Sequence, residues 1–332
     1  MRVLFAGSPA IAVPSLEKLF NIEGIEIAGV LTNTDTAKGR HGRPQPTEVG
    51  EAARKMQLQN ASGFPILKSL KLDSAVREQV ISLKPDILIS FAYGRIFGPK
   101  FLALFPLGGI NIHPSILPKY RGPSPVQAAI LNRDNVTGIS IQKLALQMDS
   151  GDILACRELQ LTGKETAGSL GAAISVMAAE MLPGVLEKTA DGTVKPVKQN
   201  HEDASYCPLI NKDDGIIDWS RSAAEIEAKI RAFDIWPLCR TIHKGRELII
   251  LKADVYKESL QGANAQCGQV LGTDKNSGIL VQTGDGILSV TELQYQAKKA
   301  LHWRDFLNGA RDFVCDEPRE TSFDVQSPAL LG

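Results

Sequence analysis

The stretch Arg2-Val-Leu-Phe-Ala-Gly-Ser-Pro9 indicates the fold class. Residues 2–6 are mostly apolar and are followed by Gly7-Ser8-Pro9, which is typical of a buried strand that ends in a turn. Pro14 and the apolar residues after it predict a helix directly after the turn. A strand, a turn and a helix in this order predict a strand-helix-strand fold with a parallel sheet.

The same alternation continues through the first half of the chain. We expect strands at 25–31, 65–67, 86–91, 109–113, 137–144 and 153–161, and helices at 47–57, 73–83, 124–131 and 166–188. Strands that alternate with helices form a mostly parallel sheet that is covered on both faces. The sequence therefore predicts a Rossmann-like α/β domain over residues 1–188.

The second half has a different pattern. Residues 189–208 are polar, rich in turn residues and nearly aperiodic, which predicts a linker. Ser222-Ala-Ala-Glu225 has the form of a capping box before a helix that ends near 233. Short strands are expected at 246–253, 268–271, 279–282 and 287–293. We therefore predict a small OB-like β-barrel over 209–315 and a polar tail over 316–332.

The composition excludes several classes of protein. Of the 332 residues 43% are hydrophobic and 22% charged, which is typical of a folded globular protein. The 37 Lys and Arg residues balance 37 Asp and Glu residues, so a site for nucleic acid or another polyanion must be local. The five cysteines lie far apart and form no CxxC pair, which argues against a disulfide framework and a zinc cluster. The apolar run at the amino terminus is too short for a signal peptide or a membrane span, so we expect a cytoplasmic protein without membrane contact.

Three polar residues form a candidate catalytic group. Asn111 and His113 alternate with apolar residues, so both side chains leave the predicted strand on one face. Asp149 follows later in the chain, in the Gly-containing loop Met148-Asp-Ser-Gly151. A carboxamide can donate to a carbonyl oxygen, an imidazole can supply a proton or a positive charge, and a carboxylate can orient the imidazole. This combination at the carboxyl end of a strand predicts a carbonyl-binding site.

The segment Asn111-Ile-His-Pro-Ser-Ile-Leu-Pro118, with the distant Asp149 and Gly151, resembles the signature of the 10-formyltetrahydrofolate-dependent formyltransferases. Further matches extend from residue 2 to about 314. They are Phe5-Ala-Gly-Ser-Pro9, Ala12-Val-Pro-Ser-Leu16, Phe91-Ala-Tyr-Gly94, Tyr120-Arg-Gly-Pro-Ser-Pro-Val-Gln127, Asp218-Trp219, Arg231-Ala-Phe233 and Trp236-Pro237. They are similar to the members of that family that formylate the methionine carried by initiator tRNA. The resemblance therefore implies an enzyme of translation initiation.

The resemblance also implies roles for individual residues. Asn111, His113 and Asp149 would be catalytic: Asn111 and protonated His113 would stabilise the oxyanion, and Asp149 would help to manage protons. The formyl donor would be 10-formyltetrahydrofolate, acting as a co-substrate. Its binding segment would be Ser115, Ile116, Leu117 and Pro118, where Ile116 replaces the usual Leu. No metal is implied, and no NAD, because Gly7-Ser8-Pro9 lacks the G-x-G-x-x-G spacing.

The resemblance implies initiator tRNA as the partner. Lys38, Arg40 and Arg43 form a basic loop after the second predicted strand, and in the family this loop inserts into the acceptor stem. Flexible basic segments suit phosphates. The chain then reads Arg43-Pro-Gln-Pro-Thr-Glu48, where the family usually has further lysines.

In the family the barrel domain supports tRNA binding with a basic face. Here residues 206–332 contain 15 Lys and Arg against 18 Asp and Glu, so only a local patch can serve. Candidate residues for it are Lys244, Arg246, Lys298, Lys299 and Arg304.

Other functions remain as alternatives. The chain could formylate an amino sugar or another small amine, hydrolyse 10-formyltetrahydrofolate, or bind tRNA without catalysis. Tyr93-Gly94 could be a turn or could line the donor pocket. Trp219, Phe233 and Trp236 are expected in the core of the small domain, because aromatic residues dominate core burial. We expect a monomer.

Overall fold

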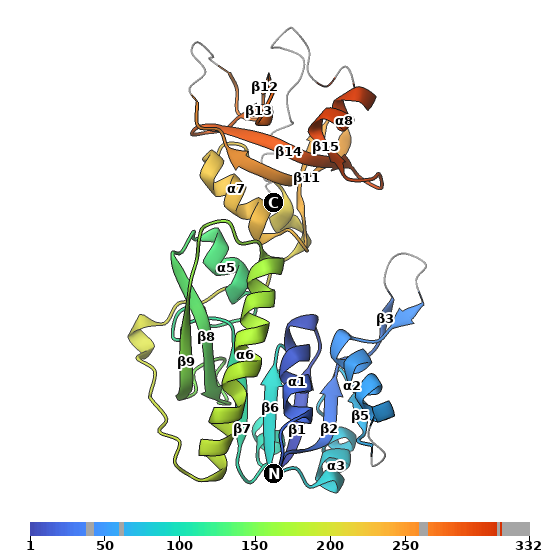
Figure 1. Cartoon of the computed structure of the whole chain (residues 1–332), viewed down its shortest axis with the longest axis vertical. Coiled ribbons are helices and arrows are strands. Elements are labelled where there is room, and N and C mark those ends of the chain that lie inside the picture. The colour runs from blue at the N-terminus through green and yellow to red at the C-terminus, as the bar shows by residue number, and fades with distance from the viewer. Residues whose placement is uncertain (38–42, 60–62, 259–264, 311–312, 314–332) are drawn as a thin grey trace, which may run out of the picture. The chain divides into compact units, whose positions relative to one another are not determined.

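The computed structural model of the protein describes residues 1–37, 43–59, 63–258, 265–310 and 313. The chain divides into two compact units, which are drawn in Figure 1. Unit 1 comprises Met1–Val126, Asn135–Leu161 and Ser169–Leu209. Unit 2 comprises Gln127–Asp134, Thr162–Gly168 and Ile210–Gly332.

A seven-stranded sheet forms the centre of unit 1, in the order β5-β2-β1-β6-β7-β8-β9. The first five strands in this order are parallel, and β8 and β9 pair antiparallel. The predicted fold class, a mostly parallel α/β sheet, is confirmed. The strands are β1 (Arg2–Gly7), β2 (Glu26–Thr32), β5 (Ile66–Lys68), β6 (Ile87–Phe91), β7 (Gly109–His113), β8 (Val136–Lys143) and β9 (Ile153–Gln160).

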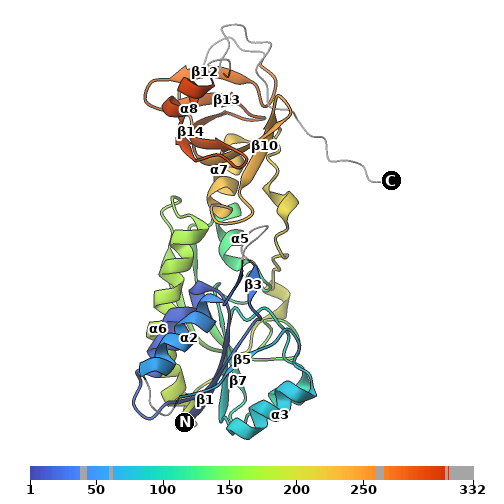
Figure 2. The ribbon, with the colours of Figure 1, turned by 90° about the vertical axis from the view of Figure 1, so that its right-hand side faces the viewer.

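Helices cover both faces of this sheet. Figure 2 shows α2 and α6 on one face and α3 on the opposite face. The helices are α1 (Val13–Phe20), α2 (Glu48–Gln59), α3 (Ser74–Leu83), α4 (Pro99–Leu102) and α6 (Ala167–Ala190), and the 3-10 helix η1 (Ala10–Ala12) precedes α1. α6 is long and apolar enough to cross a membrane by length and composition alone. Leu170, Ile174, Ala178 and Leu182 of α6 are fully buried, as expected for a core helix.

On the α3 side of the sheet, every second residue of the strands packs against a row of aromatic rings. Leu4 and Ala6 of β1 lie in this cluster, because every second side chain of a strand points to the same face. Tyr93 belongs to the cluster, and burial raises its pKa to about 12. Gly94 follows with φ +77°, a conformation that favours glycine. Tyr93 is thus a core residue followed by a turn at Gly94, and the lining of the donor pocket by these two residues stays a prediction.

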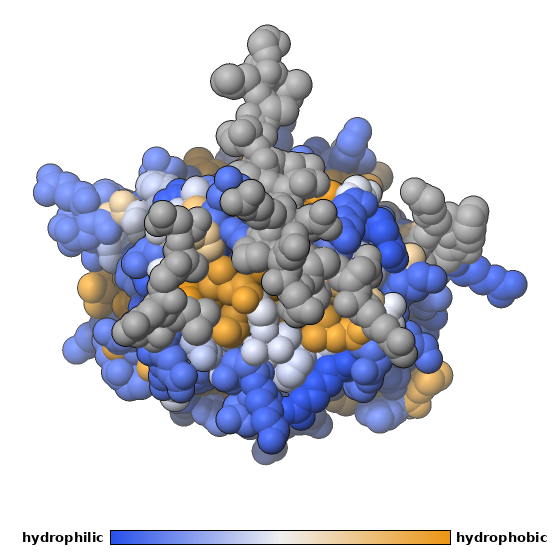
Figure 3. Space-filling view, turned by 90° about the horizontal axis from the view of Figure 1, so that it is seen from above, coloured by the Kyte–Doolittle hydropathy of each residue, from blue (hydrophilic) through white to orange (hydrophobic). Residues whose placement is uncertain are grey.

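Unit 2 contains an antiparallel sheet in the order β10-β11-β14-β13-β12, with β15 paired to β14. This arrangement fits the small barrel that was predicted, although β10 and β15 were not expected. The elements are β10 (Cys239–His243), β11 (Arg246–Val255), β12 (Val270–Asp274), β13 (Gly278–Gln282), β14 (Ile287–Tyr295), β15 (Leu301–His302), α7 (Ala223–Ala232), α8 (Trp303–Gly309) and most of α5 (Pro125–Leu131). In the view from above, hydrophilic residues dominate the rim and hydrophobic residues show nearer the middle (Figure 3).

The predicted capping box at α7 is confirmed. Ser222 Oγ accepts from the Glu225 amide at 3.2 Å, and a Glu225 carboxylate oxygen accepts from the Ser222 amide at 3.0 Å. The expected core placement is confirmed for Trp219 and Phe233 and is wrong for Trp236, which is 51% exposed. Trp236 lies after the end of α7, beyond the turn of helix that buries its apolar face.

Residues 189–208, which were predicted as a linker, lie within unit 1. Ile153 and Val197 exchange two backbone hydrogen bonds of 2.8 Å, so this segment pairs with the start of β9. Further along, the Arg121 amide donates to the Ser205 carbonyl and the Cys207 amide donates to the Arg121 carbonyl, both at 2.8 Å. We call residues 197–207 the strap.

Candidate active site

The site is built on one face of two neighbouring strands, β7 and β8. In the antiparallel register Asn111 lies opposite Gln142, and His113 lies opposite Ser140. Residues opposite each other in a sheet point to the same face, so the four polar side chains lie side by side. His113, Ser140 and Gln142 are at most 4% exposed. The alternation of apolar and polar residues in both strands thus creates a buried polar surface.

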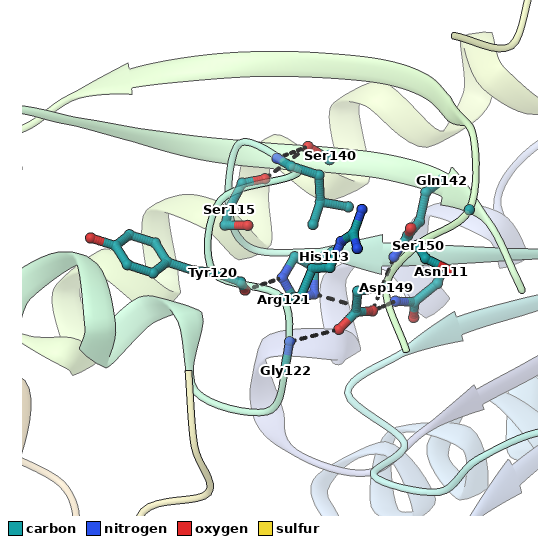
Figure 4. A network of polar contacts seen from close by, with 12 residues as sticks. Asn111, His113, Ser115, Tyr120, Arg121, Gly122, Ser140, Gln142, Asp149 and Ser150 are labelled. Atoms are coloured by element: carbon teal, nitrogen blue, oxygen red, sulfur yellow. Dashed lines mark hydrogen bonds and ion pairs between the residues drawn. The ribbon is translucent and has the colours of Figure 1, made fainter. Parts of the chain in front are cut away.

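Asp149 joins this surface from the loop between β8 and β9 (Figure 4). Its Oδ1 accepts hydrogen bonds from Asn111 Nδ2 at 3.2 Å and from Gln142 Nε2 at 3.0 Å. Its Oδ2 accepts from the backbone amide of Gly122 at 2.9 Å. The three residues predicted as catalytic, Asn111, His113 and Asp149, therefore lie together.

Two glycines allow the loops around Asp149 to approach so closely. A Cβ at Gly151 would lie 1.8 Å from the Lys143 carbonyl oxygen, which no side chain can tolerate. Gly122 has φ +115°, and a Cβ there would lie 2.3 Å from the Cys207 carbonyl oxygen. The Asp-x-Gly and Arg-Gly parts of the sequence are thus explained by backbone packing beside the carboxylate.

The His113 ring is held in one tautomer. Its Nε2 lies 2.8 Å from the Tyr120 carbonyl oxygen, and because a carbonyl only accepts, Nε2 carries the hydrogen. Its Nδ1 lies 3.6 Å from Asp149 Oδ1. Burial lowers the pKa of His113, while the Asp149 charge and the Tyr120 carbonyl oppose this in part. The resting imidazole is therefore neutral, and not protonated as the resemblance implies, and its basic nitrogen faces a carboxylate.

The segment predicted to bind the formyl donor is a turn fixed to β8. Leu117 donates its amide to Ser140 Oγ at 3.0 Å, and Ser140 Oγ donates to the Ser115 carbonyl at 2.8 Å. The Ser115 and Leu117 side chains are buried, whereas Ile116 and Pro118 are half-buried. The first pair therefore shapes the turn, and the second pair is partly open to a ligand.

The predicted tRNA loop is described only in part. Lys38 and Arg40 lie outside the described residues. Arg43 is exposed and immediately precedes β4 (Pro44–Gln45), which pairs with β3 (Thr36–Ala37). The described part of the loop is thus the base of a hairpin, separate from the strands that carry His113.

Three residues of the site were not among the predicted site residues. Gln142 alternates with buried isoleucines on β8, the same signal that identified Asn111, so the pattern could have indicated it. Arg121 lies in the matched segment Tyr120–Gln127, which was given no role, and it is 1% exposed. Gln199 is 7% exposed in the strap, where the sequence has no periodic pattern that could reveal it.

Comparison with known proteins matches both parts of the chain to one family. Residues 1–186 match the family model described as formyl transferase, and residues 209–311 match formyl transferase, C-terminal domain. A methionyl-tRNA formyltransferase of Treponema denticola is 46% identical over 318 residues, covering 95% of this chain and 98% of the relative. A methionyl-tRNA formyltransferase of Borrelia hermsii is 38% identical over 314 residues, with 95% and 98% covered.

Solved structures show the same fold. HypX from Aquifex aeolicus in complex with tetrahydrofolic acid is similar with a TM-score of 0.61 at 18% identity, over 97% of this chain and 50% of that chain. An N-formyltransferase from Helicobacter canadensis, in complex with folinic acid and dTDP-3-aminofucose, has a TM-score of 0.62 at 21% identity, over 87% and 98%. With both domain models and full-length relatives in agreement, the chain belongs to the formyltransferase family, within its methionyl-tRNA formyltransferase branch.

Proposed function

We propose that this protein transfers the formyl group of 10-formyltetrahydrofolate to the α-amine of methionine esterified to initiator tRNA. The observation that carries the proposal is the cluster of Asn111, His113 and Asp149 on one buried face, in a chain 46% identical to a methionyl-tRNA formyltransferase. In the reaction a new bond joins the formyl carbon to the amine, the bond from that carbon to the donor nitrogen breaks, and one proton passes from the amine to the donor.

Asn111 is positioned to stabilise negative charge. Its Nδ2 carries two hydrogens, and one is donated to Asp149 Oδ1 at 3.2 Å. The second can donate to the formyl oxygen as this oxygen becomes an oxyanion. A preorganised donor of this kind contributes about 3–4 kcal/mol to transition-state stabilisation. Asn111 therefore acts on the rate more than on folding.

His113 and Asp149 are positioned to move the proton. The basic Nδ1 of the neutral His113 can accept the proton that the amine loses, and Asp149 Oδ1 lies 3.6 Å from it. The nearby carboxylate stabilises the imidazolium that forms, and the proton then passes to the donor nitrogen. Three hydrogen bonds to Asp149 keep the carboxylate in place during this step.

The formyl donor would contact apolar side chains that lie close to the catalytic residues in the chain. Ile116 and Pro118 are half-buried on the turn fixed to β8. Leu146 and Met148 are 65% and 49% exposed and closely precede Asp149 in the chain. Ligand sites are typically lined by apolar side chains with a few polar groups. We assign Ser115 and Leu117 to shaping the donor site and Ile116 and Pro118 to contacting the donor.

The tRNA would be contacted by the loop with Lys38, Arg40 and Arg43 and by a basic edge on unit 2. We define the basic edge as Lys244, Arg246, Lys298 and Lys299, all of which are exposed. Two adjacent turns form it, because Leu248 pairs with Tyr295 and the Gln296 amide donates to the Glu247 carbonyl at 3.0 Å. A cluster of this kind attracts phosphates although residues 206–332 carry no net positive charge.

The proposal includes a cytoplasmic location and a monomeric enzyme. The described cysteines Cys156, Cys207, Cys239 and Cys267 are free thiols, which suits a reducing compartment. Sedimentation of the pure protein at micromolar concentration tests the oligomeric state: a mass of 35.9 kDa supports a monomer and twice that mass contradicts it.

The function is tested by incubating the protein with 10-formyltetrahydrofolate and either charged or uncharged initiator tRNA. We expect formylmethionine only on charged tRNA. Formate release that does not depend on tRNA would instead identify a hydrolase. Formylation of an amino sugar without activity on tRNA would identify the small-amine alternative, and tRNA binding without turnover would identify a silent binding protein.

A further inference from the structure

Arg121 is a buried cation, and its side-chain hydrogen bonds to described residues all go to the strap. It is 1% exposed, and Gln199 Oε1 accepts from its Nε at 3.1 Å and from its Nη2 at 2.7 Å. Its other donors reach Tyr206 Oη at 3.2 Å and His201 Nδ1 at 2.9 Å. None of these three partner atoms belongs to a carboxylate. Burying a charge without a carboxylate partner costs free energy. We therefore asked what the guanidinium does to Gln199, which accepts two of its hydrogen bonds.

The guanidinium determines which way the Gln199 amide faces. Arginine only donates, so the oxygen of the amide must face Arg121 and the nitrogen must point to the other side. There Gln199 Nε2 donates to the carbonyl oxygens of Asp149 at 2.9 Å and of Gly151 at 2.7 Å. The same nitrogen lies 3.2 Å from Gln142 Oε1. Gln199 therefore joins the strap to the turn that carries the Asp149 carboxylate.

This turn needs such support. Asp149 has φ +50°, in the left-handed region that residues with a side chain rarely adopt. Its neighbour Gly151 is packed against the Lys143 carbonyl, so the turn has no room to relax on that side. The two hydrogen bonds from Gln199 lie on either side of Ser150. They fix the direction in which the Asp149 carboxylate points.

We propose that Gln199 is a positioning residue that holds Asp149 beside His113 and Asn111, and that Arg121 acts by orienting the Gln199 amide. The catalytic consequence rests on the function proposed above. The positioning itself does not rest on that function, because the hydrogen bonds that hold Asp149 are present in the protein without substrates.

The test compares Gln199→Leu with Gln57→Leu. Gln57 is a matched control, because its Nε2 also donates to a backbone carbonyl of unit 1, that of Phe64, away from the site. The first readout is the pKa of the His113 imidazole, followed by NMR without substrates and assigned with His113→Gln. If Asp149 turns away, His113 loses a nearby opposite charge and its pKa falls by about one unit. Gln57→Leu is expected to leave it unchanged.

The second readout is formyl transfer. Gln199→Leu is expected to lower kcat by about ten- to a hundredfold, as for a misplaced catalytic group, with the KM for the formyl donor within about twofold. If Gln199→Leu fails to fold, Gln199→Asn keeps a carboxamide one methylene shorter, and the same two changes are expected at smaller size. An unchanged His113 pKa in the folded variant overturns the proposal. This outcome is readable even if the wild type proves to have a different activity.

Discussion

Replacing Asp149 with Asn removes one charge and almost no volume. The carboxylate lies 3.6 Å from His113 Nδ1, and both side chains are at most 11% exposed. It also accepts from three donors, and an amide offers only one oxygen where the carboxylate offers two. Asp149→Asn therefore removes the stabilisation of the imidazolium and turns an NH2 group towards at least one donor.

The size of the effect follows from this distance. Two unit charges about 4 Å apart interact by about 4 kcal/mol at an effective dielectric of about 20, which suits a site that solvent screens little. This energy applies only once His113 is protonated, so it lowers the transition state and not the resting enzyme. Because about 1.4 kcal/mol corresponds to a factor of ten, we expect kcat to fall about a thousandfold.

The assay is single-turnover formyl transfer to charged initiator tRNA with both substrates saturating. Circular dichroism and thermal unfolding of the variant serve as folding controls. A folded Asp149→Asn variant whose rate falls less than about tenfold would refute the role of the charge. A loss confined to the KM of the donor would show instead that Asp149 binds substrate.

Four other predictions concern titration, packing, capping and charge. Burial puts the folded pKa of His113 below its ordinary value of 6.5, so its contribution to stability is complete above pH 6.5 and is lost as the pH falls towards the folded pKa. Urea unfolding between pH 7 and 5 should therefore show a steeper loss for the wild type than for His113→Gln. Gly151→Ala should lower Tm and activity, whereas Gly184→Ala, in open space on α6, should raise stability by about 0.5–1 kcal/mol in thermal unfolding. Ser222→Ala should cost about 1 kcal/mol in urea unfolding with kcat unchanged, because it removes only the α7 cap. Lys299→Glu should weaken tRNA binding and make the slope of log Kd against log salt shallower; an unchanged slope would exclude the basic edge as a phosphate contact.

The parallel sheet and the catalytic group were predictable because both depend on local alternation. β1 (Arg2–Gly7) and β6 (Ile87–Phe91) are largely buried strands whose pattern is visible in the sequence. Asn111 and His113 share a face because side chains alternate along a strand, and this holds whatever the rest of the chain does. The family motif that contains Asp149 and Gly151 also indicated which loop meets Asn111 and His113.

The missed features depend on contacts between distant residues. β10 reads Cys-Arg-Thr-Ile-His, and its Arg240 and His243 are buried although polar residues usually indicate exposure. Arg240 is buried because Asp213 and Glu247 pair with it, which no local pattern shows. Gln199 is similar: its partners Arg121 and Asp149 lie far away in the sequence, so its role is visible only in the folded chain.

The most direct test of the account is single-turnover formyl transfer by the wild type and Asn111→Ala, with the affinity for 10-formyltetrahydrofolate measured in parallel. We predict that the wild type formylates charged initiator tRNA, and that Asn111→Ala does so about a hundred- to a thousandfold more slowly with nearly unchanged donor affinity, because it lacks one oxyanion donor. A fully active Asn111→Ala, or a wild type that releases formate whether or not charged tRNA is present, would contradict the account.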